Sequence, residues 1–190
     1  MRLKISVFLT ALLSERQKMN ILIIGPSWVG DMMMSHSLYQ QLKIQYPNCN
    51  IDVMAPNWCK PLLVRMPEVR KAIEMQLGHG AFELGTRYRL GKSLREQYDM
   101  AIVLPNSLKS ALIPFFAKII HRRGWKGESR YILLNDLRAN KKDYPMMVQR
   151  YVALAFEKDA VPKADDIPVL KPYLTIEPAQ HAETLKNFEI

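Results

Sequence analysis

Residues 20–54 contain the feature that most limits the fold of this chain. A continuous apolar run, Asn20–Ile24, is followed by the glycine-bounded loop Gly25–Gly30. Asp31–Tyr46 then places apolar residues at four-residue steps, which predicts a helix, and a second apolar run follows at Ile51–Met54. Apolar runs without alternation are typical of strands buried on both faces of a parallel sheet. This strand–loop–helix–strand order predicts the start of a doubly wound α/β sheet.

The rest of the chain continues the alternation less regularly. Residues 127–144 are expected to be a loop with a helical stretch. After Lys158 the chain becomes rich in proline, which predicts a linker at residues 161–190 and one Rossmann-like domain at residues 19–160. Further strands are expected at Ala72–Leu77, Asp99–Leu104 and His121–Trp125, and helices at Trp58–Val64, Leu84–Gln97, Leu108–Ile119 and Pro145–Phe156.

Residues 1–18 are interpreted as an N-terminal extension. The short apolar stretch Ile5–Leu13 follows two basic residues, as in a signal peptide, but no small-residue cleavage pattern comes after it. The stretch is far shorter than the roughly 20 residues of a membrane-spanning helix. Three interpretations remain open: an upstream start or added extension before Met19, an anchor on a membrane surface, or a signal peptide.

Composition narrows the class of protein and of partner. The chain has 190 residues, of which 48% are hydrophobic and 24% are charged, as in globular domains. The composition excludes a collagen, a coiled coil and a polytopic membrane protein. Cys49 and Cys59 cannot form a disulfide framework and are interpreted as reduced thiols. A net charge of +9 favours an anionic partner, whether nucleic acid, acidic lipid or a phosphorylated sugar.

The Gly25–Gly30 loop has the G-x-x-x-x-G spacing of a phosphate-binding loop but not its chemistry. Asp31 and Met32 stand where such a loop has Lys and Ser or Thr, and Ser27 replaces the second glycine of a dinucleotide-binding motif. Two interpretations of Asp31 remain. One is a capping or first-turn acid that stabilises the helix. The other is a general base at the rim of the sheet, where α/β proteins build their sites.

The remaining candidates also have more than one interpretation each. Ser107 and Lys109, after a predicted buried strand, form either a helix cap or a contact to an anion or a sugar. The basic run with Arg122, Arg123 and Arg130 is either a solvated edge, a nucleic-acid patch or a site for a small anion. The basic helix Leu84–Gln97 has a solvated face as its default interpretation, and the alternative is a contact with acidic lipid head groups. His79 lies in a glycine-flanked loop, exposed or in contact with a ligand.

Several longer segments resemble the heptosyltransferases of glycosyltransferase family 9. The resemblance runs from Met19 to about Pro172 and includes GPSWVGDMMMSHSLYQQL, IDVMAPNWCKPLL, YDMAIVLPNSLKSALIPFFA and HRRGWKGESRYILLND. It implies a GT-B fold, of which this chain is the first, acceptor-side domain, with residues 161–190 leading toward a missing donor-binding domain. It also implies inverting, metal-independent transfer of heptose from ADP-L-glycero-D-manno-heptose to an inner-core heptose of lipopolysaccharide.

The resemblance also assigns roles to the candidate residues. Asp31 matches the family's general base, and Lys109 and Arg130 match contacts to anionic acceptor groups. The expected acceptor site further includes the residues Ser107, Arg122, Arg123 and His79, and the loop glycines Gly25 and Gly30.

The resemblance gives expectations for partners and location as well. We expect no cofactor other than the donor substrate ADP-heptose, bound through the missing domain, and no nucleic acid. The protein is expected to be cytoplasmic and peripheral to the acidic inner membrane surface, and the chain alone to be inactive. The alternative is a non-catalytic α/β module that binds an anionic ligand or nucleic acid.

Overall fold

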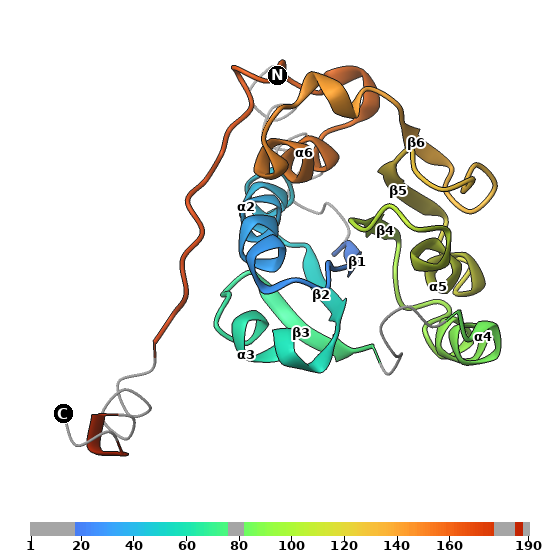
Figure 1. Cartoon of the computed structure of the whole chain (residues 1–190), viewed down its shortest axis with the longest axis horizontal. Helices are drawn as coiled ribbons and strands as arrows, with labels where there is room; N and C mark the ends of the chain where they lie inside the picture. The colour runs from blue at the N-terminus through green and yellow to red at the C-terminus, as the bar shows by residue number, and fades with distance from the viewer. Residues whose placement is uncertain (1–17, 76–81, 177–184, 188–190) are drawn as a thin grey trace, which may run out of the picture.

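The computed structural model describes residues 18–75, 82–176 and 185–187, and this part of the chain contains one six-stranded parallel sheet (Figure 1). The strand order is β3-β2-β1-β4-β5-β6, so the direction of winding reverses between β1 and β4. This order confirms the predicted Rossmann-like, doubly wound α/β sheet. The strands are β1 (Asn20–Ile24), β2 (Asn50–Ala55), β3 (Val69–Glu74), β4 (Met100–Val103), β5 (His121–Trp125) and β6 (Asp136–Arg138).

Helices cover both faces of the sheet (Figure 1). On one face lie α2 (Val29–Gln45), α3 (Lys60–Leu63) and α6 (Met147–Val152), and on the other lie α4 (Leu84–Ser93) and α5 (Leu112–Phe116). The connections contain short 3₁₀ turns, η1 (Asn57–Cys59), η2 (Leu108–Ala111), η3 (Lys141–Asp143), η4 (Ala153–Ala155) and η5 (Lys158–Ala160).

The central strand β1 shows why the apolar run forms a buried strand. Ile21 and Ile23 pack into the cluster beneath α2 and α6, whereas Leu22 and Ile24 pack toward α4 and α5. All four side chains are fully buried. Burial of each such side chain contributes about 1.5–3 kcal/mol. Both neighbours of β1, the strands β2 and β4, pair with it in parallel register, which fixes the carboxyl ends of the three strands at one edge.

Several predicted elements differ in extent from those observed; among them, the helix expected at Leu84–Gln97 ends at Ser93. The helix expected at Leu108–Ile119 is the 3₁₀ turn η2 followed by the short α5, and Lys118, with a φ of 55°, follows its end. The helix expected at Pro145–Phe156 is α6 followed by η4. The strand expected at Ala72–Leu77 begins three residues earlier, at Val69.

One strand was missed altogether. Residues 127–144 were expected to be a loop, but they contain β6, which has only three residues and a polar sequence. Pairing with β5 supplies the backbone hydrogen bonds that define it. The N-terminal extension, apart from Lys18, and the candidate residue His79 lie outside the described residues.

The segment after Ala160 runs back across the domain instead of leaving it directly. Residues 161–176 form no helix or strand and extend along α2 (Figure 1). The Ser37 hydroxyl donates to the carbonyl of Leu170, and the Thr175 amide donates to the carbonyl of Arg65 at 2.8 Å. The role of residues 161–190 as a linker to a further domain stays a prediction. Across the described ranges, no helix combines the length and apolar character needed to cross a membrane.

Candidate functional site

Asp31 lies at the carboxyl edge of the sheet, in the first turn of α2. The N-cap residue is Trp28, so of the two structural interpretations the first-turn acid is correct and the N-cap is not. The side chain is partly exposed, and its carboxylate makes no hydrogen bond or ion pair with the residues that the structure describes. Helix N-terminal amides favour a negative charge here. Asp31 therefore presents an unpaired carboxylate beside the switch point between β1 and β4.

The two glycines of the loop have different environments. The Gly25 amide donates to the carbonyl of Met54 at 2.8 Å, and a Cβ at Gly25 would lie 2.8 Å from Cε of Met32. Gly25 therefore allows the loop to pack closely against β2 and α2. Gly30 precedes Asp31 inside the helix, and nothing lies within 4 Å of the position that its Cβ would take. A ligand can approach the backbone there.

Tyr151 forms part of the wall behind Asp31. It lies on α6, which packs against α2, and its side chain is buried. Burial raises the pKa of the Tyr151 phenol above its ordinary value, and the negative charge of Asp31 raises it further. Tyr151 therefore remains a neutral hydroxyl near the carboxylate.

The loop after β4 carries Ser107 and Lys109 on the other side of the switch point. The Leu108 amide, in the first turn of η2, donates to Oε2 of Glu128 at 2.9 Å, so a carboxylate of the chain itself occupies this turn. The carbonyl of Ser107 accepts the Ser110 hydroxyl at 2.6 Å. The Lys109 ammonium has no such partner among the described residues, which leaves it available to an anion from outside.

Arg130 is buried, with only 1% of the residue exposed, which excludes a solvated edge at this position. Its expected contact with the acceptor stays a prediction. Its Nη1 donates to the carbonyl of Pro105 at 2.5 Å, and its Nη2 donates to that of Trp125 at 2.5 Å. Burial lowers the pKa of Arg130 to about 10. The guanidinium thus ties the loop after β4 to the end of β5, and in this arrangement it positions the loop that bears Lys109.

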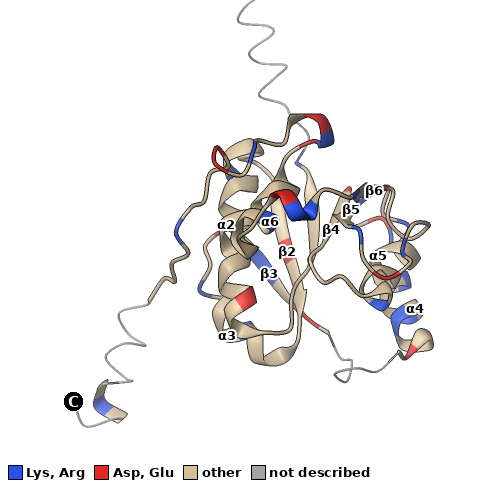
Figure 2. Ribbon diagram, turned by 45° about the horizontal axis from the view of Figure 1, so that its top comes forward, with Lys and Arg blue, Asp and Glu red and all other residues tan. Residues whose placement is uncertain are grey.

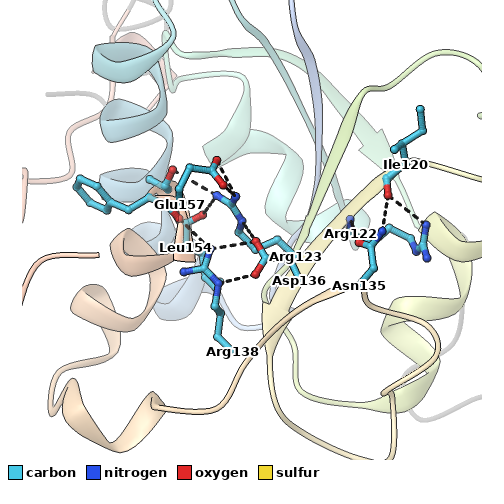
Figure 3. A network of polar contacts seen from close by, with 10 residues as sticks. Ile120, Arg122, Arg123, Asn135, Asp136, Arg138, Leu154 and Glu157 are labelled. Carbon is cyan, nitrogen blue, oxygen red and sulfur yellow. Dashed lines mark hydrogen bonds and ion pairs between the residues drawn. The ribbon is translucent and has the colours of Figure 1, made fainter. Parts of the chain in front are cut away.

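Arg123 is likewise buried and paired within the protein, which excludes a solvated edge there, while its expected place in the acceptor site stays a prediction (Figure 3). Only 3% of it is exposed; Nε pairs with Oδ2 of Asp136 at 2.5 Å, and Nη2 pairs with the Glu157 carboxylate at 2.9 Å. The Asp136 carboxylate also pairs with Arg138, whose Nε lies 2.6 Å from Oδ1. This network joins β5, β6 and the segment after α6.

The guanidinium of Arg122, which precedes Arg123 on β5, donates its hydrogen bonds to backbone carbonyls. Its Nε donates to the carbonyl of Leu133 at 2.7 Å, and its Nη1 donates to that of Ile119 at 2.5 Å. Burial lowers the pKa of Arg122. Its own amide donates to Oδ1 of Asn135 at 2.8 Å, so this arginine holds the loop between β5 and β6 (Figure 3).

Two residues at the carboxyl edge were not singled out as site residues from the sequence. Trp58, in η1 directly after β2, is 56% exposed, and its Nε1 donates to the carbonyl of Ser27 at 2.8 Å. Lys141 follows β6, and burial together with the charges of Arg150 and Arg130 lowers its pKa. The signal for Trp58 was its place just after a predicted strand, whereas Lys141 follows a strand that was itself missed.

Metal-ligand groups and thiols were also candidates for chemistry in this domain. Within the described ranges, no group of three His, Cys, Asp or Glu side chains is arranged to hold a metal ion. Cys49 and Cys59 are buried free cysteines, and burial raises the pKa of both thiols.

Comparisons with known proteins show which proteins this chain is similar to. Residues 87–190 match Glycosyltransferase family 9 (heptosyltransferase). The chain is 95% identical over 171 residues to lipooligosaccharide heptosyltransferase 2 of Haemophilus influenzae, covering 90% of this chain and 49% of that protein. It is 58% identical over 176 residues to lipopolysaccharide heptosyltransferase 2 of Escherichia coli, covering 90% of this chain and 51% of that protein.

A solved structure of a heptosyltransferase also has a fold similar to that of this chain. The structure of E. coli ADP-heptose lps heptosyltransferase II matches with a TM-score of 0.82 at 55% identity, covering 90% of this chain and 51% of that one. The chain spans about half the length of the curated relatives it matches. The family match covers more than half of the residues, and so this chain belongs to glycosyltransferase family 9.

Proposed function

We propose that this chain is the acceptor-side half of an inverting heptosyltransferase. Its reaction is the transfer of heptose from ADP-L-glycero-D-manno-heptose to an inner-core heptose of lipopolysaccharide. The observation that carries the proposal is the unpaired carboxylate of Asp31 at the carboxyl edge of β1. Further support comes from the 95% identity to a lipooligosaccharide heptosyltransferase over most of the chain.

The proposed chemistry uses Asp31 as a general base. The carboxylate accepts the proton of the acceptor hydroxyl while that oxygen forms a bond to the anomeric carbon of the donor heptose. The bond between this carbon and the phosphate oxygen breaks, and ADP leaves with the electron pair from the opposite face, which inverts the anomeric centre. A positioned general base contributes about 10²–10⁴-fold in rate. Lys109, at the neighbouring loop, holds anionic groups of the acceptor.

A joined chain tests this proposal. The chain is extended with the second half of the H. influenzae relative, and heptose transfer is measured for the parent and for Asp31→Asn. The substitution is expected to lower turnover by about 10²–10⁴-fold because the amide accepts no proton. Asp159→Asn, which changes an exposed acid on η5, is the matched control. Turnover of Asp31→Asn within about threefold of the parent would contradict the base assignment.

We further propose that the protein works at the cytoplasmic face of the inner membrane, in contact with acidic lipid. The outer side of α4 supports this, since Leu84 and Tyr88 are exposed there and the basic residues Arg89 and Lys92 are exposed on the same helix. Figure 2 shows Lys and Arg residues in blue on α4. Apolar and basic side chains on one helix face suit an anionic membrane surface.

Vesicle sedimentation tests the membrane contact. The chain should bind phosphatidylglycerol vesicles more tightly than phosphatidylcholine vesicles and should lose this preference at high salt. Arg89→Glu with Lys92→Glu should weaken binding more than Lys158→Glu with Lys163→Glu, which reverses two exposed charges in and after η5, since each basic residue near the surface contributes about 1 kcal/mol. Equal effects of the two charge reversals would exclude this face of α4.

A further inference from the structure

Two exposed tryptophans flank the loop that carries the candidate base. Trp58 is 56% exposed and Trp28 is 71% exposed, although large aromatic side chains are usually covered. Trp28 is the N-cap of α2 and lies three residues before Asp31, a spacing that places both on the same side of the helix start. Trp58 reaches the same loop from the end of β2. Two exposed aromatic side chains therefore lie beside the candidate base.

The indole of Trp58 is held in a fixed position. Its Nε1 donates to the carbonyl of Ser27 at 2.8 Å, and the thiol of Cys59 lies 3.8 Å from the same oxygen. The polar atom of the ring is therefore satisfied within the protein, while more than half of the residue remains exposed. A ring that is already ordered loses little conformational entropy when a ligand packs on it.

The chemistry on the two sides of Asp31 differs. Trp58 follows β2 and bonds to Ser27, the neighbour of Trp28, whereas Lys109 follows β4, on the other side of β1. A ligand that fits both sides carries a neutral ring and, apart from it, an anionic group. A pyranose has such a ring, since its C–H face is apolar and its hydroxyls lie around the rim.

We propose that Trp58, together with Trp28, forms a platform on which the pyranose ring of the acceptor packs. This inference rests on the proposed function, because the base must touch the hydroxyl that it deprotonates and the ring bearing that hydroxyl must lie beside it. Contact with the indole rings fixes the position of the acceptor ring relative to the carboxyl edge of the sheet. The hydroxyl that points from the rim then meets the carboxylate of Asp31.

Binding to the chain itself tests the platform. The chain, with ¹⁵N-labelled tryptophan, is titrated with a deacylated inner-core oligosaccharide that ends in heptose. The indole N–H resonance of Trp58 is expected to shift, and Trp58→Ala should raise the dissociation constant about five- to tenfold. Trp58→Phe, which keeps an aromatic ring, should lose less affinity for the oligosaccharide than Trp58→Ala does. Tyr131→Ala, which removes another exposed aromatic residue, is the matched control and should bind as the parent does.

Three results would overturn the platform. The first is equal affinity for Trp58→Ala and Tyr131→Ala, and the second is no binding of the oligosaccharide by the parent. The third is unchanged oligosaccharide binding by Trp58→Ala with weaker association to the separately produced second half of the H. influenzae relative. That third result would assign this surface to the contact between halves. Oligosaccharide binding that depends on Trp58, without transfer by the joined chain, would instead overturn the proposed function and leave the platform standing.

Discussion

His36 Nε2 lies 2.6 Å from Oε2 of Glu68, and this contact joins the middle of α2 to the turn that precedes β3. The second ring nitrogen, Nδ1, accepts the backbone N–H of Tyr173 at 3.3 Å. The Tyr173 hydroxyl donates to Oε1 of the same glutamate at 3.2 Å, and its ring centroid lies 5.1 Å from that of His36. Three segments far apart in the sequence meet at one fully buried imidazole.

The first prediction is that His36 fixes the path of residues 170–175 along α2. His36→Ala removes both contacts and leaves the Tyr173 amide without its acceptor, so we expect a loss of about 1–3 kcal/mol in the free energy of unfolding. Hydrogen exchange at Tyr173 should accelerate. Gln40→Ala, which removes a more exposed hydrogen bond to the carbonyl of Lys171, is the control. Equal exchange rates in the two variants would show that His36 does not hold the segment.

The second prediction separates two glycines at the carboxyl edge. A Cβ at Gly127 would lie 2.2 Å from the carbonyl oxygen of Asn106, whereas Gly30 has open space. Gly127→Ala should therefore lower the free energy of unfolding by about 1–3 kcal/mol or more, because backbone atoms must move. Gly30→Ala, inside a helix, should leave it unchanged or raise it by about 0.5–1 kcal/mol. Urea unfolding measures both, and the reverse order would contradict the placement of these loops.

The third prediction separates Lys109 from Arg130. Lys109→Ala should weaken binding of an acidic acceptor and leave the free energy of unfolding nearly unchanged, since its ammonium has no partner among the described residues. Arg130→Ala should lower that free energy by about 2–3 kcal/mol, because the carbonyls of Pro105 and Trp125 lose their buried donor. Acceptor binding and chemical unfolding are measured for both variants. A stable Arg130→Ala with reduced affinity would show instead that Arg130 itself contacts the acceptor.

The fourth prediction concerns acid stability. Burial alone would raise the pKa of the Asp136 carboxyl, but the hydrogen bonds and charges of Arg138 and Arg123 hold it below its ordinary value. A depressed pKa in the folded state contributes stability above the unfolded pKa of about 3.9, which is lost as the pH falls through the folded pKa. Asp136→Asn should therefore destabilise the protein at pH 7, and its difference from the parent should shrink below about pH 4. Urea unfolding of the parent, Asp136→Asn and the control Asp159→Asn between about pH 3 and pH 7 checks this. If the difference in the free energy of unfolding between the parent and Asp136→Asn did not change with pH, the ionised Asp136 carboxylate would not be its source.

The sequence predicted those parts of the fold that depend on local pattern. The apolar run of β1 and the glycine loop before Asp31 identified the central strand and the edge where the candidate site lies. The short polar strand β6 has no such pattern, because its place depends on pairing with β5.

Long-range contacts also explain why the burial of Arg123 and Arg130 was not predicted from the sequence. Arg123 is 13 residues from Asp136 and 34 from Glu157 in the sequence, so nothing near it shows that its charge is compensated. Arg130 is buried because the carbonyl of Pro105, 25 residues earlier, accepts its N–H. The order of the strands brings these partners together in space, although they lie far apart in the sequence.

The last prediction is that the 190-residue chain transfers no heptose by itself. Under the proposed function, Asp31 supplies a general base, but the reaction also needs the donor held in line with the acceptor hydroxyl. Such positioning supplies about 7–11 kcal/mol of the barrier. Groups that stabilise the charge on the departing ADP are needed as well. We place both on the half of the relatives that this chain does not span. Calorimetry with ADP-heptose and a transfer assay on the chain alone check this. Micromolar donor binding, or turnover above background, would show that the residues around Asp31 and Lys109 carry part of the donor site.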